Sequence, residues 1–102
     1  MKSNLGPINL EIMWQRLISI VEECWVTIQR TSYSVAVAEA LDFGCALLDP
    51  RGRLLAHPSK AMPSFAITLP NCAKALLERY PPETLLRGDV LTTNDPWLGA
   101  GH

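Results

Sequence analysis

The chain of 102 residues lacks a long hydrophobic run, a cluster of basic residues and any pair of closely spaced cysteines. No stretch approaches the roughly 18 consecutive apolar residues that span a membrane, and the N-terminus lacks the apolar centre of a signal peptide. The formal net charge is −1 and no run of Lys or Arg occurs, which argues against binding to nucleic acid. We therefore expect neither a membrane nor a nucleic acid as a partner.

Cysteine is scarce and its spacing is uninformative for metal binding. Cys24, Cys45 and Cys72 are odd in number, far apart and outside any Cys-x-x-Cys motif. Such usage is typical of a reducing compartment, where free cysteines serve as small buried hydrophobic residues. We therefore expect a cytoplasmic location.

Familiar catalytic motifs are missing too. The sequence contains no Gly-x-Ser-x-Gly nucleophile elbow, no phosphate-binding or dinucleotide-binding glycine loop and no His-Glu-x-x-His. The polar residues that could still carry chemistry are Asp42, Asp49, His57, Asp89, Asn94, Asp95 and His102. Any site must be assembled from these scattered side chains.

The composition describes one small globular unit. Hydrophobic residues make up 48% and charged residues 19% of the chain, which has room for a single domain. A domain of this size buries only about 60–70% of the surface that its unfolded chain exposes. Three Trp residues and the many aliphatic ones exceed what so short a chain can hide. We therefore expect an apolar face made for further chain or for a partner subunit.

The pattern predicts a long helix over residues 7–30, followed by a β-hairpin. Apolar residues recur at three- and four-residue steps, Pro7 suits the first turn, and Asn4 is a possible cap. Residues 35–41 fit a strand or a short helix equally and are read as a loop with helical tendency. The hairpin joins strands over residues 43–48 and 53–57 through residues 49–52, whose Asp-Pro-x-Gly order is typical of a β-turn.

A second helix is expected over residues 69–80, with Thr68 as its cap and Pro70 in its first turn. Pro81 and Pro82 stop it. Residues 89–93 are apolar and β-branched and predict a last strand. The expected fold is therefore α+β, with a small sheet backed by helices.

The end of the chain indicates a larger parent. Residues 94–102, Asn-Asp-Pro-Trp-Leu-Gly-Ala-Gly-His, form a turn-rich run that normally leads from a strand to more chain. The expected strand before it also needs neighbours on both sides. We therefore expect residues 1–102 to be an N-terminal fragment that is cut within this loop.

Asp42 and His102 are among the side chains that could ligate a metal, and Asp42 also has a simpler interpretation. Asp42 precedes a predicted strand, where it could be a turn residue or a ligand projecting from the strand end. His102 follows two glycines that allow a loop to present an imidazole, which with a carboxylate suits Zn, Mn or Fe. His57 is expected to be a solvated or hydrogen-bonded imidazole. Because a catalytic metal takes about three protein ligands, further residues are required.

Five motifs in order give the chain a resemblance to the N-terminus of the hydantoinase B family. They are Pro-Ile-Asn-Leu-Glu-Ile-Met-Trp-Gln-Arg-Leu (7–17), Gln-Arg-Thr-Ser-Tyr-Ser (29–34), Asp-Phe-Gly-Cys-Ala-Leu (42–47), Gly-Arg-Leu-Leu-Ala (52–56), and Arg-Gly-Asp-Val (87–90) followed by residues 94–102. The family includes N-methylhydantoinase and 5-oxoprolinase B parts, caprolactamase, and subunits of acetone and acetophenone carboxylases.

The resemblance implies an ATP-dependent enzyme of two cooperating parts. A hydantoinase A-like partner subunit would phosphorylate the substrate, and the B part would complete the reaction at a divalent metal. For the hydrolases the reaction opens a cyclic amide, and for the carboxylases it joins carbon to a ketone. By position, Asp42 and His102 match places where the family offers metal ligands. A truncated, non-catalytic remnant that serves only assembly is the alternative.

The chain departs from the family pattern near Asp42. Many members carry Lys-Glu-Arg before this Asp, whereas here Ala38, Glu39, Ala40 and Leu41 precede it. Gly44 replaces a Ser, and Trp97 replaces a Tyr. The implied fold is unaffected, but the substrate class is left open between cyclic amide and ketone.

Overall fold

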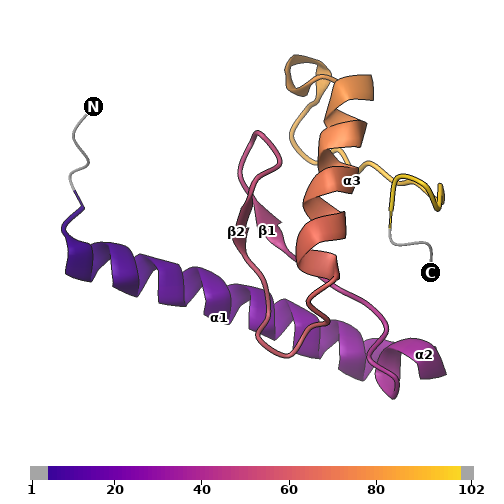
Figure 1. Ribbon diagram of the computed structural model, residues 1–102, viewed down its shortest axis with the longest axis horizontal. Helices are drawn as coiled ribbons and strands as arrows, with labels where there is room; N and C mark the ends of the chain where they lie inside the picture. The colour runs from indigo at the N-terminus through magenta and orange to yellow at the C-terminus, as the bar shows by residue number, and fades with distance from the viewer. Residues whose placement is uncertain (1–4, 100–102) are drawn as a thin grey trace.

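The computed structural model describes residues 5–99. Its order is α1 (Pro7–Thr31), α2 (Val35–Ala38), β1 (Leu47–Leu48), β2 (Leu54–Ala56), α3 (Phe65–Arg79) and the short 3-10 helix η1 (Pro82–Thr84). Figure 1 shows α1 as a long bar, with the hairpin rising from its middle and α3 standing beside the hairpin. The α+β expectation is confirmed.

The long helix matches the prediction in length and position. Pro7 lies in its first turn, where a missing N–H costs nothing, and Gly6 is the N-cap without a side-chain hydrogen bond. Asn4, the possible cap, lies outside the described residues. Val21 and Trp25 are buried, whereas residues 7–16 are exposed. The fully buried residues of the helix therefore lie in its C-terminal half.

The hairpin is confirmed but shorter than expected. Leu47 pairs with Ala56 and Leu48 with Leu54, with an irregularity between the two pairs. The Gly52 N–H donates to the Asp49 carbonyl over 2.9 Å, which closes the predicted turn, and Gly52 has φ +81°. Local turn chemistry thus placed the hairpin correctly, while residues 43–46 remain loop.

The second helix begins earlier than predicted. The N–H groups of Phe65 and Ala66 donate to the carbonyls of Met62 and Pro63 over 3.1 Å, so the chain already turns there. Ser64, not Thr68, is the N-cap, and Pro70 lies inside the helix. The proline that marks the start is therefore Pro63, and the prediction for residues 69–80 missed the first four residues of α3.

The predicted strand over residues 89–93 is wrong for the part of the chain that the structure describes. Residues 89–95 form no regular element, and Val90 is exposed. A β-branched run becomes a strand only when a neighbouring strand takes up its hydrogen bonds. Within residues 5–99 the sheet has two strands, and neither pairs with this segment.

The core is small and lies where α1, the hairpin and α3 meet. Its buried hydrophobic residues are Val21, Trp25, Ala56, Ala61 and Phe65. The expectation that the cysteines are buried is wrong for Cys24, which is exposed, while Cys45 and Cys72 are half-buried. The Cys45 thiol donates to the Val21 carbonyl over 3.6 Å, and burial, then the nearby Cys24, raise the pKa of that thiol.

Candidate functional site

Asp42 lies in the loop between α2 and β1, in a turn of unusual geometry. Leu41 before it has φ +58°, a region that residues with a side chain rarely adopt. The Asp42 N–H donates to the Ala36 carbonyl over 2.9 Å, and the Phe43 N–H donates to the Leu41 carbonyl over 3.0 Å. Asp42 is thus the central residue of a three-residue turn, and its Oδ1 is buried.

Neighbouring aromatic residues hold this turn on two sides. The Phe43 ring stacks on Trp25 of α1, with centroids 5.2 Å apart and planes inclined by 18°. On the other side Gly44 approaches α3 so closely that a Cβ atom there would lie 2.6 Å from the Phe65 Cβ. The residues flanking Asp42 are therefore fixed between two helices. Backbone strain that packing maintains in this way occurs most often at functional sites.

The described residues do not by themselves form a metal centre. Within residues 5–99, no three His, Cys, Asp or Glu side chains lie close enough together to hold an ion. Asp42 is the predicted ligand in that range, and His102 lies outside the described residues. Because a catalytic metal takes about three protein ligands, Asp42 supplies one of them at most. The pairing of Asp42 with His102 stays a prediction.

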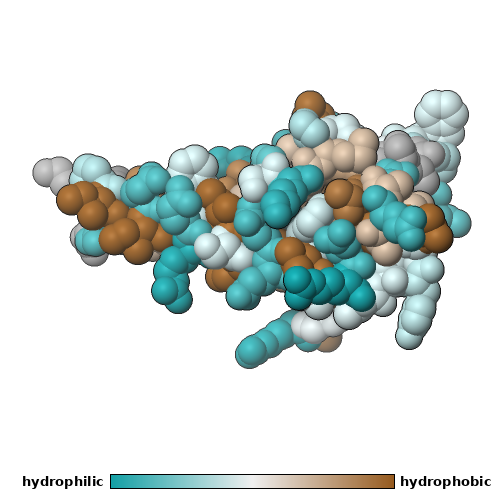
Figure 2. Space-filling view, turned by 90° about the horizontal axis from the view of Figure 1, so that it is seen from below, coloured by the Kyte–Doolittle hydropathy of each residue, from teal (hydrophilic) through white to brown (hydrophobic). Residues whose placement is uncertain are grey.

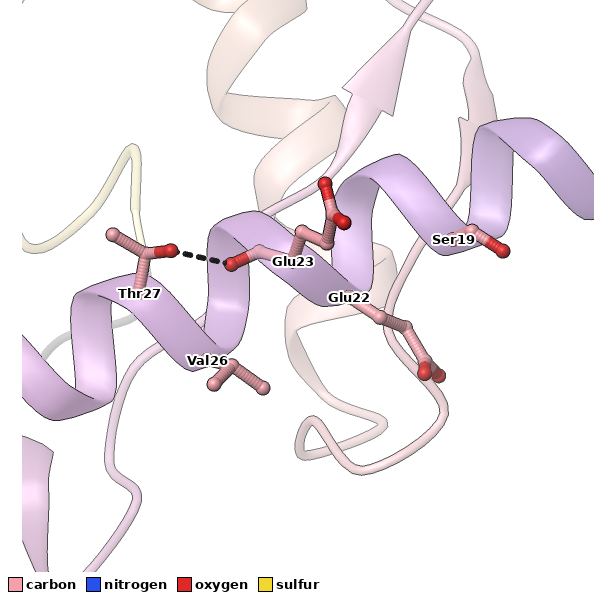
Figure 3. A pocket seen from close by; sticks show the side chains of 5 residues that line it. All are labelled: Ser19, Glu22, Glu23, Val26 and Thr27. Carbon is pink, nitrogen blue, oxygen red and sulfur yellow. Dashed lines mark hydrogen bonds between the residues drawn. The ribbon is translucent and has the colours of Figure 1, made fainter.

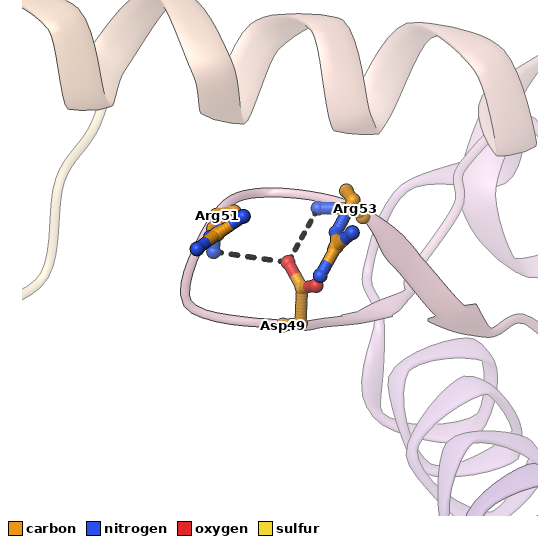
Figure 4. Close-up of polar contacts among 3 residues, drawn as sticks. All are labelled: Asp49, Arg51 and Arg53. Atoms are coloured by element: carbon orange, nitrogen blue, oxygen red, sulfur yellow. Dashed lines mark hydrogen bonds and ion pairs between the residues drawn. The ribbon is translucent and has the colours of Figure 1, made fainter. Parts of the chain in front are cut away.

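Asp49 organises the hairpin turn, as its sequence position indicates. Figure 4 shows its carboxylate facing the backbone N–H groups of Arg51 and Arg53, which donate to Oδ1 over 2.9 and 2.8 Å. The Arg53 guanidinium donates to Oδ2 over 2.6 Å. The Arg53 backbone hydrogen bond leads the contacts that hold the pKa of Asp49 below its usual value. With its oxygens engaged in the turn, Asp49 has a structural role.

His57 and Asp89 also have local roles. The half-buried His57 donates from Nδ1 to the Pro58 carbonyl over 3.0 Å, as expected for a hydrogen-bonded imidazole. Asp89 accepts the Leu86 N–H at Oδ2 over 2.9 Å and closes the turn that contains Gly88, whose φ is +93°. Neither residue is placed beside Asp42 by these contacts.

The described part of the terminal loop folds around Asp95. Its Oδ1 accepts the Trp97 N–H over 2.9 Å, and its carbonyl accepts the N–H groups of Leu98 and Gly99 over 3.3 and 3.2 Å. Asp95 therefore holds this turn through its side chain as well as its backbone. Asn94 and Trp97 are exposed, so this loop presents polar and aromatic groups to its surroundings.

A shallow depression of about 520 Å³ lies on the exposed side of α1 (Figure 3). Ser19, Glu22, Glu23, Val26 and Thr27 line it, and the Thr27 hydroxyl donates to the Glu23 carbonyl. Glu22 Oε1 accepts the N–H of Ser59 over 3.0 Å and also its hydroxyl, which lower the pKa of the Glu22 carboxyl. These contacts join α1 to the loop before α3.

The sequence pattern missed the two features that define the Asp42 turn. Nothing in a Leu predicts a positive φ, because the residue normally avoids that region. The close approach of Gly44 to Phe65 carried a signal, since glycine is the residue that allows backbone to meet a neighbouring side chain. That signal could be interpreted only once α3 was known to begin at Phe65.

Comparison with known proteins identifies the family. The sequence model described as Hydantoinase B/oxoprolinase matches residues 6–102. The chain is 33% identical over 100 residues to the putative B-type subunit of a D-/L-hydantoinase from Pseudomonas sp., covering 96% of this chain and 17% of that protein. It is 36% identical over 104 residues to a 5-oxoprolinase from Dictyostelium discoideum, covering 98% of this chain and 8% of that protein.

A third relative, 5-oxoprolinase 1 from Arabidopsis thaliana, is 37% identical over 95 residues, with 93% of this chain and 7% of that protein covered. The chain thus spans less than a fifth of the length of these relatives. No solved structure matches it. Among the helices of residues 5–99, none is long and apolar enough to cross a membrane. Since the family model matches residues 6–102, the chain belongs to the hydantoinase B/oxoprolinase family.

Proposed function

We propose that this chain forms the N-terminal part of a hydantoinase B-type subunit in a cytoplasmic, ATP-dependent enzyme that opens cyclic amides. The family match over residues 6–102 carries the proposal. Its relatives are named after hydantoin and 5-oxoproline, both of which contain a ring amide. The subunit acts with a hydantoinase A-like partner, a proposal supported by the name of the Pseudomonas relative, which designates one subunit of a hydantoinase.

The division of labour follows from the chemistry of the amide. A ring amide is a poor electrophile, because its nitrogen donates electron density to the carbonyl carbon. ATP-dependent phosphorylation of the amide oxygen by the partner gives an imidate phosphate, whose carbon is a better target for water. Water then adds to that carbon and the ring C–N bond breaks, which leaves the free amine and an acyl phosphate. A second water hydrolyses the acyl phosphate to a carboxylate and phosphate. The B-type subunit is proposed to hold the activated substrate during the attack of water.

Asp42 is the described residue proposed to serve this reaction. Its turn is fixed between α1 and α3 by the contacts of Phe43 and Gly44. The positive φ of Leu41 is a strained conformation that this packing maintains, and such strain supports a functional role for the turn. A divalent Zn, Mn or Fe ion is proposed to bind at Asp42 and His102. The described residues supply only the first of these, so the ion needs ligands from elsewhere in the subunit.

A chimeric protein tests the proposal. In the Pseudomonas relative, the matched stretch is replaced by this chain, and the chimera is combined with its partner, ATP and a hydantoin or 5-oxoproline. We expect ATP-dependent ring opening, measured by chromatography of the product. Activity only with a ketone and bicarbonate would instead indicate the carboxylase branch. Absence of both activities in a folded chimera would favour a non-catalytic remnant.

Two matched substitutions locate the site within that chimera. Asp42→Asn is expected to lower the ring-opening rate by roughly tenfold or more and to lower bound metal, because the amide is a poorer ligand. Asp49→Asn, an equivalent change in the hairpin turn, should lower thermal stability with little change in rate per folded molecule. Equal rates in the two variants would remove Asp42 from the proposed site.

A further inference from the structure

The N-terminal arm of α1, residues 7–16, carries large apolar side chains that the other described elements leave largely exposed. Figure 1 shows the start of α1 projecting past the hairpin, and Figure 2 shows hydrophobic side chains gathered over this end of the molecule. The exposed members are Ile8, Leu10, Ile12, Met13 and Trp14. Leu10 is 55% and Trp14 51% exposed. Such a group of side chains marks an interaction surface on a protein of this size.

The apolar residues of the arm point in several directions. Ile12, Met13 and Trp14 are consecutive, so they leave the helix axis about 100° apart. A helix that lies on the surface of its final assembly needs one apolar stripe, whereas a helix that is apolar on several sides is surrounded by protein. The arm therefore has the character of a helix that is enclosed.

A groove of about 700 Å³ runs along the arm where it meets the hairpin. Leu10, Met13, Trp14 and Leu17 of α1 line one side, and Leu54 and Leu55 of β2 line the other. The Trp14 indole N–H donates to the Leu55 carbonyl over 3.2 Å and so occupies a backbone acceptor of β2. Because this acceptor is engaged and the lining is mostly apolar, a segment that enters the groove contacts aliphatic and aromatic side chains.

One charged residue sets the polarity of the groove. Glu11 lies in its lining, and one carboxylate oxygen, Oε1, accepts the Gln15 side-chain N–H over 3.1 Å. A carboxylate has more acceptor sites than this single hydrogen bond uses. The matching surface is therefore apolar, with a Lys, Arg or N–H group placed to reach Glu11.

The amount of exposed surface indicates whether a second copy of the chain or a larger polypeptide covers the arm. The accessible surface is 8164 Å², roughly 2,400 Å² more than a compact monomer of this size exposes. The radius of gyration is 15.3 Å, against about 13 Å for a compact domain. A standard interface removes only about 800 Å² from each partner. The excess surface is about three times this area, so one interface with a second copy would leave most of it exposed. Large apolar residues are also exposed on α3 and on the C-terminal segment, namely Ile67, Val90 and Trp97.

We infer that the arm and its groove are an interface for the remainder of a hydantoinase B-type subunit, the portion that the relatives carry in addition to the matched stretch. That portion makes up more than four-fifths of the relatives, which is enough polypeptide to surround the arm. It inserts apolar side chains between α1 and β2 and a cationic or N–H group at Glu11. The inference rests on family membership and is independent of the reaction proposed above.

A binding measurement between two separate polypeptides tests the inference. One is this chain, and the other is the Pseudomonas relative without the stretch that the chain matches. Isothermal titration should show a one-to-one complex. Leu10→Asp, which places a charge in the groove, is expected to weaken binding roughly tenfold or more. Thr27→Asp, at an exposed polar position of α1 outside the groove, is the matched control and should bind almost as well as the original chain.

Equal binding by the two variants would overturn the inference, as would the absence of a complex. A homodimer that Leu10→Asp dissolves would also overturn it, in favour of a second copy. If the shortened relative is insoluble, Leu10→Cys is labelled with a maleimide in this chain and in the chimera, and peptide mass spectrometry gives the rates. Slower labelling in the chimera, by about tenfold, supports the interface, whereas equal rates contradict it.

Discussion

The ring of Trp25 in α1 stacks on the ring of Phe43, with the ring centroids 5.2 Å apart. Phe43 directly follows Asp42 in the chain, and Trp25 is the buried aromatic residue of α1 within residues 5–99. Trp25 is 3% exposed. The contact therefore links the stability of the small core to the position of the proposed ligand. A change at Trp25 should affect both.

Trp25→Ala is expected to destabilise the chain by about 3–5 kcal/mol, because it removes a large buried side chain and leaves a cavity. For a domain with so few buried residues, this is a large part of the free energy of unfolding. Trp25→Phe keeps a ring opposite Phe43 and should cost less. Urea denaturation followed by circular dichroism measures both, and similar losses would show that the stacking contributes little.

Replacements at Leu41 test the backbone strain. Ala normally stabilises a structure more than Gly, but at φ +58° its Cβ is strained. We therefore expect Leu41→Gly to be more stable than Leu41→Ala by about 1 kcal/mol. The same two residues compared at Ala36 of α2 should show the ordinary order, since that position is helical. Thermal denaturation measures the differences, and the ordinary order at residue 41 would contradict the strain.

A side chain at residue 44 should push α3 away from the Asp42 turn. A Cβ there would meet the Phe65 Cβ and Cγ at 2.6 Å, so Gly44→Ala is expected to cost about 1–3 kcal/mol. Gly44→Ser, which adds a larger side chain at the same place, should cost at least as much. Gly6→Ala is the control, because nothing lies within 4 Å of its Cβ position. Comparable melting temperatures for both alanine variants would refute the close contact.

The stability of the fold should fall in acid through Glu22 and Asp49. The Ser59 hydroxyl, together with its N–H, lowers the pKa of Glu22, and the Arg53 N–H leads the bonds that lower the pKa of Asp49. Both pKa values are lower in the folded state, so their contribution is complete above the unfolded values of about 4.3 and 3.9. It is lost as the pH falls through the folded values. Urea midpoints measured from pH 7 downwards should show this decrease.

Ser59→Ala isolates the Glu22 part of that effect. It removes the hydroxyl donor but leaves the Ser59 N–H, so the pKa of Glu22 should rise towards its usual value without reaching it. Ser19→Ala removes a neighbouring hydroxyl that donates to the Gln15 carbonyl instead, and it should leave Glu22 unchanged. NMR titration of the Glu22 carboxyl carbon distinguishes the two, and an unchanged pKa in Ser59→Ala would disprove the assignment.

Elements with local causes were predictable from the sequence. The hairpin depends on the Asp-Pro-x-Gly turn, in which the Asp49 carboxylate accepts the N–H groups of Arg51 and Arg53. Helix α1 follows from the three- and four-residue spacing of its own apolar residues. Residues 89–93 show the limit, because a strand requires partners that their sequence does not specify. The same holds for Asp42. Its residue type suggested a ligand, but the neighbours that fix it come from α1 and α3.

The hydrogen bond from Trp14 to Leu55 has a consequence for solubility. A two-stranded hairpin with unpaired backbone groups invites edge-to-edge aggregation with other chains. The Trp14 indole N–H donates to the Leu55 carbonyl, so this acceptor is not available for pairing with a strand of another chain. Trp14 thus has two effects: its ring adds apolar surface to the groove, and its N–H reduces the tendency of the hairpin to aggregate.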